Sequence, residues 1–150
     1  MFRKTNFSGV VLAVSLMLLF VFSGLAQGAQ EITQAADSFL KSVPQNKLWL
    51  ISVAELKTLI EEKGDSLFIL DVRPDFMYKN GHIPGSVNVP LPTLVDNLNQ
   101  IPKDKTIAVV CSLDTNSAFA VSVLQMLGYE AWIVEGGVPG WVKTGSPLEK

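Results

Sequence analysis

The chain is poor in cysteine, because only one of its 150 residues, Cys111, is of this type. A single cysteine excludes a disulfide within the chain. A lone thiol is either a small buried apolar residue or a reactive group, and composition alone leaves both interpretations open. The surroundings of Cys111 therefore have to decide between them.

Basic stretches are also absent. Lys and Arg total 12 and Asp and Glu total 14, which gives a net charge of −2 at pH 7. The basic residues are scattered singly and form no stripe or block. This distribution argues against nucleic acid and anionic membrane surfaces as partners.

The sequence has no cluster of His, Cys, Asp or Glu at metal-ligand spacing, and no glycine-rich nucleotide loop. Internal repeats and low-complexity segments are missing as well. These absences predict an enzyme or binding protein without a cofactor. Without the amino-terminal segment, the chain has the length of a single domain.

Residues 1–26 have the order of a secretory signal peptide. Arg3 and Lys4 precede an apolar run, and small residues follow up to Ala26, after which we expect cleavage. The alternative is an uncleaved anchor, because the apolar segment is at the lower limit of a membrane span. Either way the remaining chain is expected outside the cytoplasmic membrane, in the periplasm or tethered to that membrane's outer side. Without Arg3 and Lys4 it has ten basic and 14 acidic residues, a net charge of −4.

Short apolar runs alternate with segments of helical spacing in the rest of the chain. The predicted strands are 48–51, 67–72, 87–89, 106–110 and 131–134, and the predicted helices are 31–43, 53–63, 74–80, 91–101, 117–127 and 138–143. This alternation is typical of an α/β fold with a parallel sheet of about five strands and helices on both faces. Residues 27–46 are expected to form a leading helix and linker, and residues 47–150 the domain.

Two of these helices carry specific expectations. Ser52 and Glu55 have the spacing of a capping box at the start of helix 53–63. Its predicted buried residues are Val53, Leu56, Leu59 and Ile60. Helix 91–101 is expected to present Leu91, Leu94, Val95 and Leu98 on one face.

The segment from Thr106 to Tyr129 organises the chain. A strand buried on both faces delivers Cys111 to its carboxyl end, and a polar loop leads into a helix. Backbone N–H groups of such a loop converge on an anion, and the helix dipole adds positive charge. This setting favours a nucleophilic thiolate. Ligands bind beyond the carboxyl ends of parallel strands, so Asp71 and Arg73 are expected at the same rim.

Three stretches resemble the rhodanese domain family. They are Asp71-Val72-Arg73 with the following GHIPGS segment 81–86 and Asn88-Val89-Pro90, then Leu127-Gly128-Tyr129, and then Val134-Glu135-Gly136-Gly137 with Trp141. Cys111 lies where this family keeps its sulfur-carrying cysteine. The resemblance covers about Lys47 to Pro147 and implies a rhodanese-like three-layer α/β fold.

The resemblance implies sulfur transfer. The thiolate of Cys111 would attack a sulfane sulfur donor such as thiosulfate or polysulfide, become a persulfide, and pass the sulfur to a thiophilic acceptor. That acceptor is a small molecule such as cyanide, or a protein. The residues expected to bind the donor and the persulfide are Ser112, Leu113, Asp114, Thr115, Asn116, Ser117 and Arg73.

The loop departs from common patterns of this family. A related phosphatase branch has a loop one residue longer that ends in arginine, whereas this loop runs from Cys111 to Asn116 and lacks arginine, which disfavours a phosphatase. Asp114 stands where glycine is common. Pointing inward, its carboxylate would oppose the helix dipole and repel dianionic thiosulfate. Pointing outward, it could recruit a cationic partner.

These departures leave an alternative function open, a rhodanese fold kept as a binding or sulfur-relay module with little thiosulfate activity. His82 is expected to be a structural hydrogen-bonding residue rather than a catalytic base. Asp71 and Arg73 are expected to pair at the strand ends, although Arg73 is also the best-placed cation for a bound anion.

Overall fold

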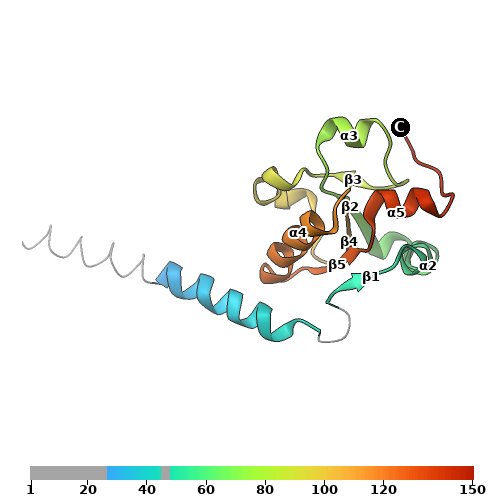
Figure 1. The fold of residues 1–150 in the computed structure, drawn as a ribbon. Coiled ribbons are helices and arrows are strands. Elements are labelled where there is room, and N and C mark those ends of the chain that lie inside the picture. The colour runs from blue at the N-terminus through green and yellow to red at the C-terminus, as the bar shows by residue number, and fades with distance from the viewer. Residues whose placement is uncertain (1–26, 45–47) are drawn as a thin grey trace, which may run out of the picture. The chain divides into compact units, whose positions relative to one another are not determined.

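The structure is a computed structural model that describes residues 27–44 and 48–150 (Figure 1). The predicted signal peptide, residues 1–26, lies outside the described residues. Contacts divide the chain into two compact units, Met1–Ser38 and Phe39–Lys150. Residues 27–42 are helical, in agreement with the predicted leading helix. None of the described helices has both the length and the apolar character needed to cross a bilayer.

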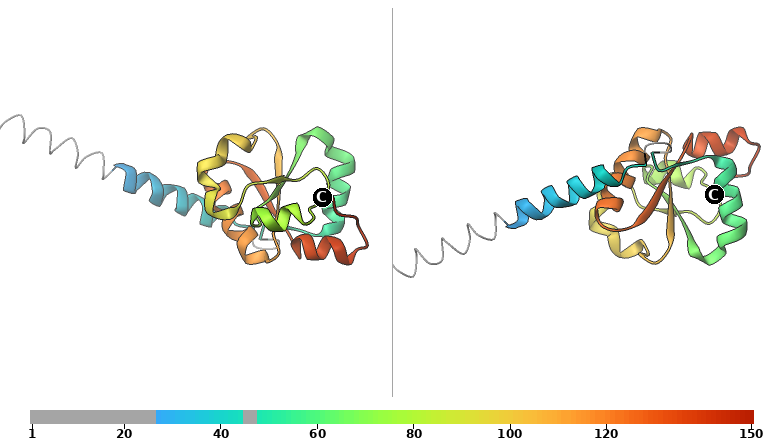
Figure 2. Two further views of the ribbon diagram at one scale, coloured as in Figure 1. Left: turned by 90° about the horizontal axis from the view of Figure 1, so that it is seen from above. Right: turned by 90° about the horizontal axis from the view of Figure 1, so that it is seen from below.

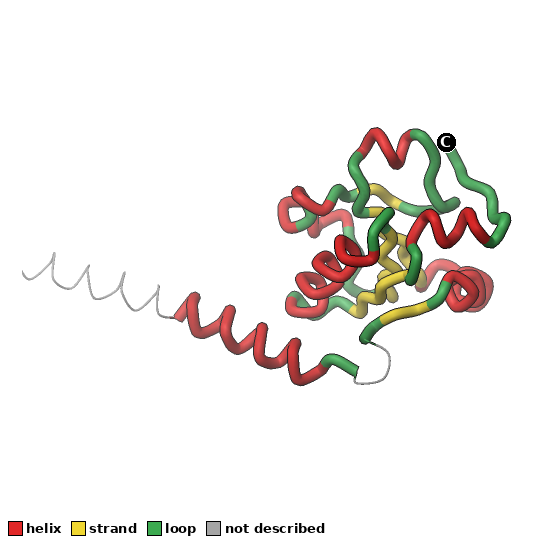
Figure 3. The backbone as a smooth tube through the Cα atoms, viewed as in Figure 1, coloured by secondary structure: helices red, strands yellow, loops and turns green. Residues whose placement is uncertain are grey.

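A five-stranded sheet forms the centre of the second unit (Figure 3). Its strands are β1 Leu50–Ile51, β2 Leu67–Asp71, β3 Val87–Asn88, β4 Thr106–Val110 and β5 Glu130–Val134, in the order β1-β5-β4-β2-β3. Every neighbouring pair is parallel. The predicted α/β fold with a parallel five-stranded sheet is therefore confirmed.

Helices cover both faces of the sheet, as Figure 2 shows from two sides. The helices are α2 Val53–Lys63, α3 Asp75–Lys79, α4 Asp114–Met126 and α5 Gly137–Lys143. The central strand β4 is buried along its whole length and contributes alternately to two cores. Ile107 and Val109 belong to the core beneath α4, whereas Ala108 and Val110 belong to the core beneath α2 and α5. This alternation follows from the two-residue period of a strand.

Helix α2 begins as the sequence predicts. Ser52 accepts a hydrogen bond from the Glu55 N–H at 3.1 Å, and the Glu55 carboxylate accepts one from the Ser52 N–H at 2.7 Å. The capping box is thus complete. The buried stripe is narrower than predicted, because Val53 and Leu56 are buried but Ile60 is 36% exposed.

The predicted helix 91–101 is wrong. Two 3₁₀ segments, Leu91–Thr93 and Val95–Gln100, take its place, and Asn97 has non-helical backbone angles. The Asn97 side chain donates to the Thr93 carbonyl at 2.8 Å, so it competes with a regular helical bond. The tighter winding turns Val95 away from the core and leaves it 63% exposed.

Helix α4 begins three residues earlier than the sequence pattern suggested, at Asp114 instead of Ser117. Leu113 has an extended backbone and is the residue that precedes the helix. The polar residues Asp114, Thr115 and Asn116 therefore form the first helical turn rather than a loop. An aspartate is favourable there, because its charge interacts well with the helix dipole.

Candidate active site

Cys111 directly follows β4, the strand that lies between β5 and β2 in the sheet. Its thiol is free, and the residue is only 3% exposed. The Cys111 carbonyl accepts a hydrogen bond from the Val138 N–H at 3.0 Å. The thiol is consequently held at the carboxyl edge of the sheet, where ligands bind in parallel α/β folds.

The first turn of α4 lies next to this thiol. Only Ser112 and Leu113 separate Cys111 from the helix, and Leu113 provides no side-chain cap for the helical N–H groups. The amide nitrogen of Asn116 lies 3.6 Å from the Cys111 sulfur and donates a hydrogen bond to it. Together with the helix dipole, this donor stabilises negative charge on sulfur.

The structure resolves where Asp114 points. One carboxylate oxygen of Asp114 accepts a hydrogen bond from the Gly136 N–H at 2.9 Å. The side chain is exposed. The carboxylate therefore lies at the rim of the site and connects the first turn of α4 to the turn between β5 and α5.

Gly137 has a role that sequence reasoning missed. Its φ is +50°, and a Cβ atom there would lie 1.9 Å from the Cys111 carbonyl oxygen. The β5–α5 turn thus passes so close to the Cys111 peptide that only glycine fits. The sequence showed the glycine pair as a family motif, but the contact joins residues far apart in the chain.

Arg73 is 5% exposed and forms an ion pair with the fully buried Asp71 at 2.6 Å. Its guanidinium also donates to the Gly81 carbonyl at 2.9 Å. The expected strand-end pair is thereby confirmed. Arg73 thus supports the strand ends, and its role in anion binding stays a prediction.

The other predicted loop residues differ in exposure. Leu113 and Thr115 are exposed, and Ser112 is half-buried. Ser117 is fully buried, and its hydroxyl has no hydrogen-bond partner within the described part of the chain. Ser117 is the fourth residue of α4, so its N–H falls within the helix rather than among the free groups of the first turn.

His82 has a structural environment. Its ring stacks on Tyr78 with ring centroids 3.8 Å apart. Its Nδ1 atom lies 3.1 Å from the Tyr78 carbonyl oxygen, and its backbone bridges to Glu149. The structural interpretation of His82 is therefore confirmed.

An apolar groove adjoins the first turn of α4. It has a volume of about 380 Å³, and Asp114 and Thr115 are among the residues that line it. Its apolar lining includes Phe39, Val43, Trp49, Ala118, Val121 and Ile133. The residues that line this groove do not include Cys111.

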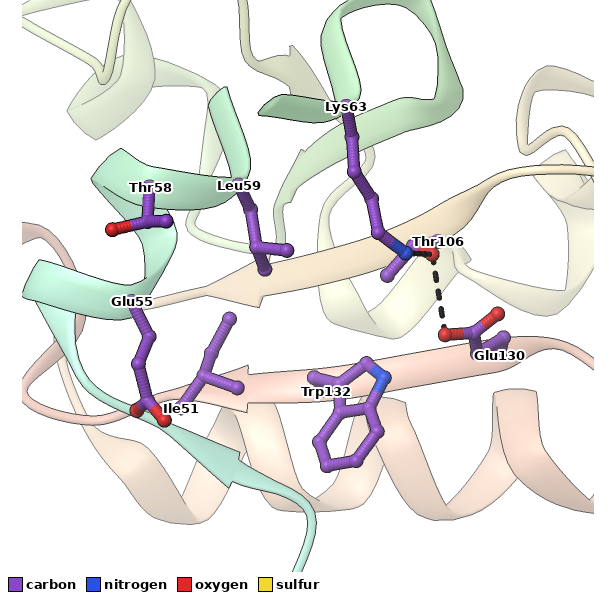
Figure 4. A pocket seen from close by; sticks show the side chains of 8 residues that line it. All are labelled: Ile51, Glu55, Thr58, Leu59, Lys63, Thr106, Glu130 and Trp132. Carbon is purple, nitrogen blue, oxygen red and sulfur yellow. Dashed lines mark hydrogen bonds between the residues drawn. The ribbon is translucent and has the colours of Figure 1, made fainter. Parts of the chain in front are cut away.

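A second pocket, of about 310 Å³, lies between α2 and the sheet and extends to the amino ends of β4 and β5 (Figure 4). Thr106 and Glu130 are the first residues of β4 and β5, whereas Cys111 follows the last residue of β4. Lys63 donates to Thr106 at 2.7 Å, and Thr106 donates to Glu130 at 3.2 Å. This pocket is therefore separate from the Cys111 site.

Comparisons with known proteins agree with this geometry. The model of the family described as rhodanese-like domain matches residues 52–144. A crystal structure of a rhodanese-like domain protein from Staphylococcus aureus is 36% identical, with a TM-score of 0.60, and the match covers 67% of this chain and 95% of that one.

Several curated relatives have names that include sulfurtransferase. The putative sulfurtransferase YtwF of Bacillus subtilis (strain 168) is 31% identical over 91 residues, which are 61% of this chain and 87% of that protein. The adenylyltransferase and sulfurtransferase uba4 of Ogataea parapolymorpha is 36% identical over 83 residues, 53% of this chain and 21% of that protein. This chain spans less than half the length of several curated relatives that it matches.

Proposed function

Since the chain belongs to the rhodanese-like domain family, we propose that it is a sulfurtransferase whose Cys111 carries sulfur as a persulfide. Sulfur transfer is the general chemistry that its sulfurtransferase-named relatives support. The proposed donor carries sulfane sulfur, as thiosulfate and polysulfide do. The proposed acceptor is a thiophilic small molecule or a protein.

The observation that carries this proposal is the position of the thiol. Cys111 is the only cysteine of the chain, and its sulfur accepts a hydrogen bond from Asn116 in the first turn of α4. The N–H groups of Ser112 to Thr115 and the Asn116 side chain are the proposed binding groups for donor and persulfide, since the Asn116 N–H already donates to the Leu113 carbonyl at 3.1 Å. A thiolate in this setting is a suitable nucleophile for a two-step transfer.

The first step forms one sulfur–sulfur bond and breaks another. With thiosulfate, the Cys111 thiolate attacks the outer sulfur, and sulfite leaves with the electron pair of the broken bond. The persulfide then gives its outer sulfur to the acceptor, and the Cys111 thiolate is restored. No external oxidant or reductant is needed in either step.

Asp114 is proposed to lower the activity toward thiosulfate. Its carboxylate is held at the rim by Gly136, and it repels a dianion that approaches Cys111. Asn116 binds the sulfur without adding a positive charge. Thiosulfate turnover should therefore be weaker than in an otherwise identical site without this carboxylate.

The alternative is a binding or sulfur-relay module with little catalytic activity. The observation that favours it is the 3% exposure of Cys111 together with the acidic rim at Asp114. A buried thiol receives sulfur only from a donor that fits closely. A relay protein would accept sulfur from one specific partner rather than from free thiosulfate.

Intact mass spectrometry separates the two functions. The purified chain is incubated with thiosulfate or polysulfide, and the Cys111→Ser variant serves as the control. A sulfurtransferase gains the mass of one sulfur on Cys111 and loses it again to cyanide. If neither donor adds sulfur, and Cys111→Ser leaves binding of any partner unchanged, the enzymatic proposal is wrong.

We also propose that the protein is exported and acts in the periplasm, or tethered to the outer side of the cytoplasmic membrane. The support is the charged, apolar and small-residue order of residues 1–26, which lie outside the described part of the chain. Amino-terminal sequencing of the protein from a periplasmic extract should begin at Gln27. A chain that still begins at Met1 in the membrane fraction would indicate an anchor.

A further inference from the structure

The pocket between α2 and the sheet lies where strand β1 is too short to cover its neighbour β5 (Figure 4). Strand β1 begins at Leu50, which pairs with Ile133, so Trp132 lies beyond the start of β1 and is only half-buried. Leu59 of α2 and Ile51 of β1 line the same space. Its volume of about 310 Å³ is sufficient for a small organic molecule, and these three side chains give it an apolar wall.

One end of this pocket has two opposite charges. Lys63, in the last turn of α2, donates to the Thr106 hydroxyl at 2.7 Å, and that hydroxyl donates to the Glu130 carboxylate at 3.2 Å. Thr106 is only 5% exposed and pairs with Glu130 in the sheet register. Figure 4 shows the three side chains together at the amino ends of β4 and β5. One threonine thus holds an ammonium and a carboxylate close to each other.

Both charged groups keep hydrogen-bonding capacity for a ligand. An ammonium has three N–H donors and a carboxylate has two oxygens, whereas the only bonds of the Lys63 and Glu130 side chains to described residues are those with Thr106. Within the same part of the chain, neither group forms an ion pair. Glu55 also lines the pocket, but it lies about 12 Å from Lys63 along α2, and its carboxylate is held by the Ser52 cap.

A neighbouring ammonium and carboxylate beside an apolar wall are complementary to a zwitterion with an apolar side chain. We propose that this pocket binds a free α-amino acid of that kind, such as leucine. The ligand carboxylate accepts a hydrogen bond from Lys63, the ligand ammonium donates to Glu130, and the ligand side chain lies against Leu59 and Trp132. The site is independent of the proposed sulfur transfer, because it lies at the amino end of β4, whereas Cys111 follows the carboxyl end.

The indole N–H of Trp132 can report binding. The full chain, labelled with ¹⁵N, is titrated with L-leucine, and the indole resonances are followed by nuclear magnetic resonance. The variant Trp132→Phe identifies the resonance of Trp132 by its disappearance. The other two tryptophans, Trp49 and Trp141, do not line the pocket and serve as internal references. Leucine should shift the Trp132 resonance in a saturable way and leave the other two unchanged.

Analogues of leucine test each part of the ligand. The amine 3-methylbutylamine lacks the carboxylate, and 4-methylpentanoate lacks the ammonium. Each should have a Kd at least about fivefold higher than that of leucine, because one charge-assisted hydrogen bond is lost. L-Alanine keeps both charges but has three fewer side-chain carbons. Its Kd should also be at least about fivefold higher, because less apolar surface is buried.

Two variants test the charged residues. Lys63→Gln should remove the preference for leucine over 3-methylbutylamine, and Glu130→Gln should remove the preference for leucine over 4-methylpentanoate. In the second variant the amide oxygen can still accept the Thr106 hydrogen bond. Lys143→Gln and Glu62→Gln are the matched controls, since both residues are exposed and lie outside the pocket. The controls should keep the wild-type Kd values, and thermal unfolding verifies the fold of all four proteins.

The possible results separate this proposal from sulfur transfer. Cys111→Ser should bind leucine as the wild type does, so a failure of sulfur loading leaves the amino-acid site unaffected. The proposal is wrong if leucine up to its solubility limit does not shift the Trp132 resonance. It is also wrong if either analogue with a single charge binds as tightly as leucine, or if neither Lys63→Gln nor Glu130→Gln changes the Kd.

Discussion

Asn116 is the side chain that contacts the sulfur of Cys111, with its amide nitrogen 3.6 Å from Sγ. Replacement by alanine removes one donor to the thiolate. We expect Asn116→Ala to slow alkylation of Cys111 by iodoacetamide at pH 7 by roughly three- to tenfold, because hydrogen bonds to charged groups are among the stronger ones. Intact mass follows the reaction without interference, since Cys111 is the only thiol.

Asn99→Ala is a suitable control, because Asn99 is exposed in the second 3₁₀ segment. It should react at the wild-type rate. An unchanged rate in Asn116→Ala would show that the amide contributes nothing to the thiolate, and that backbone groups and the helix dipole are its main stabilisers.

Gly137 is predicted to be one of the least replaceable residues of the site. Gly137→Ala places a Cβ atom 1.9 Å from the Cys111 carbonyl oxygen, at a φ of +50°. We expect a loss of more than about 3 kcal/mol in the free energy of unfolding. The added Cβ would clash with backbone atoms of Cys111, which cannot rotate away as a side chain could, and a φ of +50° is itself unfavourable for alanine. Urea denaturation measures this change.

Gly85→Ala is the matched comparison. Gly85 also has a positive φ, of +74°, but a Cβ atom there would meet nothing within 4 Å. Its replacement should cost only about 1–2 kcal/mol, the strain of the backbone alone. Equal losses in the two variants would contradict a special role for the contact between Gly137 and Cys111.

Single residues differ in how far the sequence predicted them. Cys111 was identifiable because a buried strand, a polar turn and a helix follow one another directly in the chain. The capping residues Ser52 and Glu55 were identifiable for the same reason. The bond between Asp114 and Gly136 joins residues 22 positions apart. No spacing rule encodes such a contact, so the direction of Asp114 needed the structure.

At the scale of elements, regular apolar patterns predicted the strands and α2 well. Predictions failed where polar side chains compete with the backbone. Asn97 bonds to the Thr93 carbonyl and interrupts the expected helix, although the apolar spacing continues through it. In α4 the observed helix is longer than the predicted one. Its first turn is polar and precedes the residues whose apolar spacing predicted the helix.

The capping box of α2 provides a test at this scale. Ser52→Ala removes the hydroxyl that accepts a hydrogen bond from the Glu55 N–H and donates one to the Glu55 carboxylate. The free energy of unfolding should fall by about 1 kcal/mol, the usual cost of losing a serine cap. Thermal or urea unfolding measures the difference.

Thr58→Ala is its control within the same helix. The Thr58 hydroxyl donates to the Ala54 carbonyl one turn earlier, at an exposed position. The Ala54 carbonyl lies within the helix, so the Thr58 hydroxyl does not satisfy a backbone group that would otherwise lack a partner. Its loss should change the free energy of unfolding by less than about 0.5 kcal/mol. A larger effect in Thr58→Ala than in Ser52→Ala would show that the cap is unimportant.

At the scale of the whole molecule, the parallel sheet brings the site together. Asp71 ends β2, Cys111 follows β4, and Gly136 follows β5, so three distant parts of the chain meet at one edge. The order of the strands places β4 in the middle, with its neighbours supplying the supports on either side. This convergence was predictable from the alternation of elements, whereas the apolar groove beside α4 was not.

The first residues of the second unit contribute to the lining of the groove. Phe39 and Val43 pack against the core beneath α4, and the Phe39 ring lies 5.3 Å from the ring of Trp49. The unit that starts at Phe39 contains both cores and all five strands. A fragment of residues 39–150 should therefore unfold in one cooperative transition and load sulfur on Cys111 as the full chain does.

A shorter fragment, residues 48–150, keeps every strand but lacks Phe39 and Val43. We expect its free energy of unfolding to be lower than that of fragment 39–150 by about 1–3 kcal/mol, because Trp49 loses its aromatic partner and apolar burial. Phe39→Ala in fragment 39–150 should reproduce most of the loss, which urea denaturation of all three proteins would measure. If fragment 48–150 is as stable as fragment 39–150, the packing of Phe39 on Trp49 does not stabilise the domain in solution, and the groove lacks one of its walls.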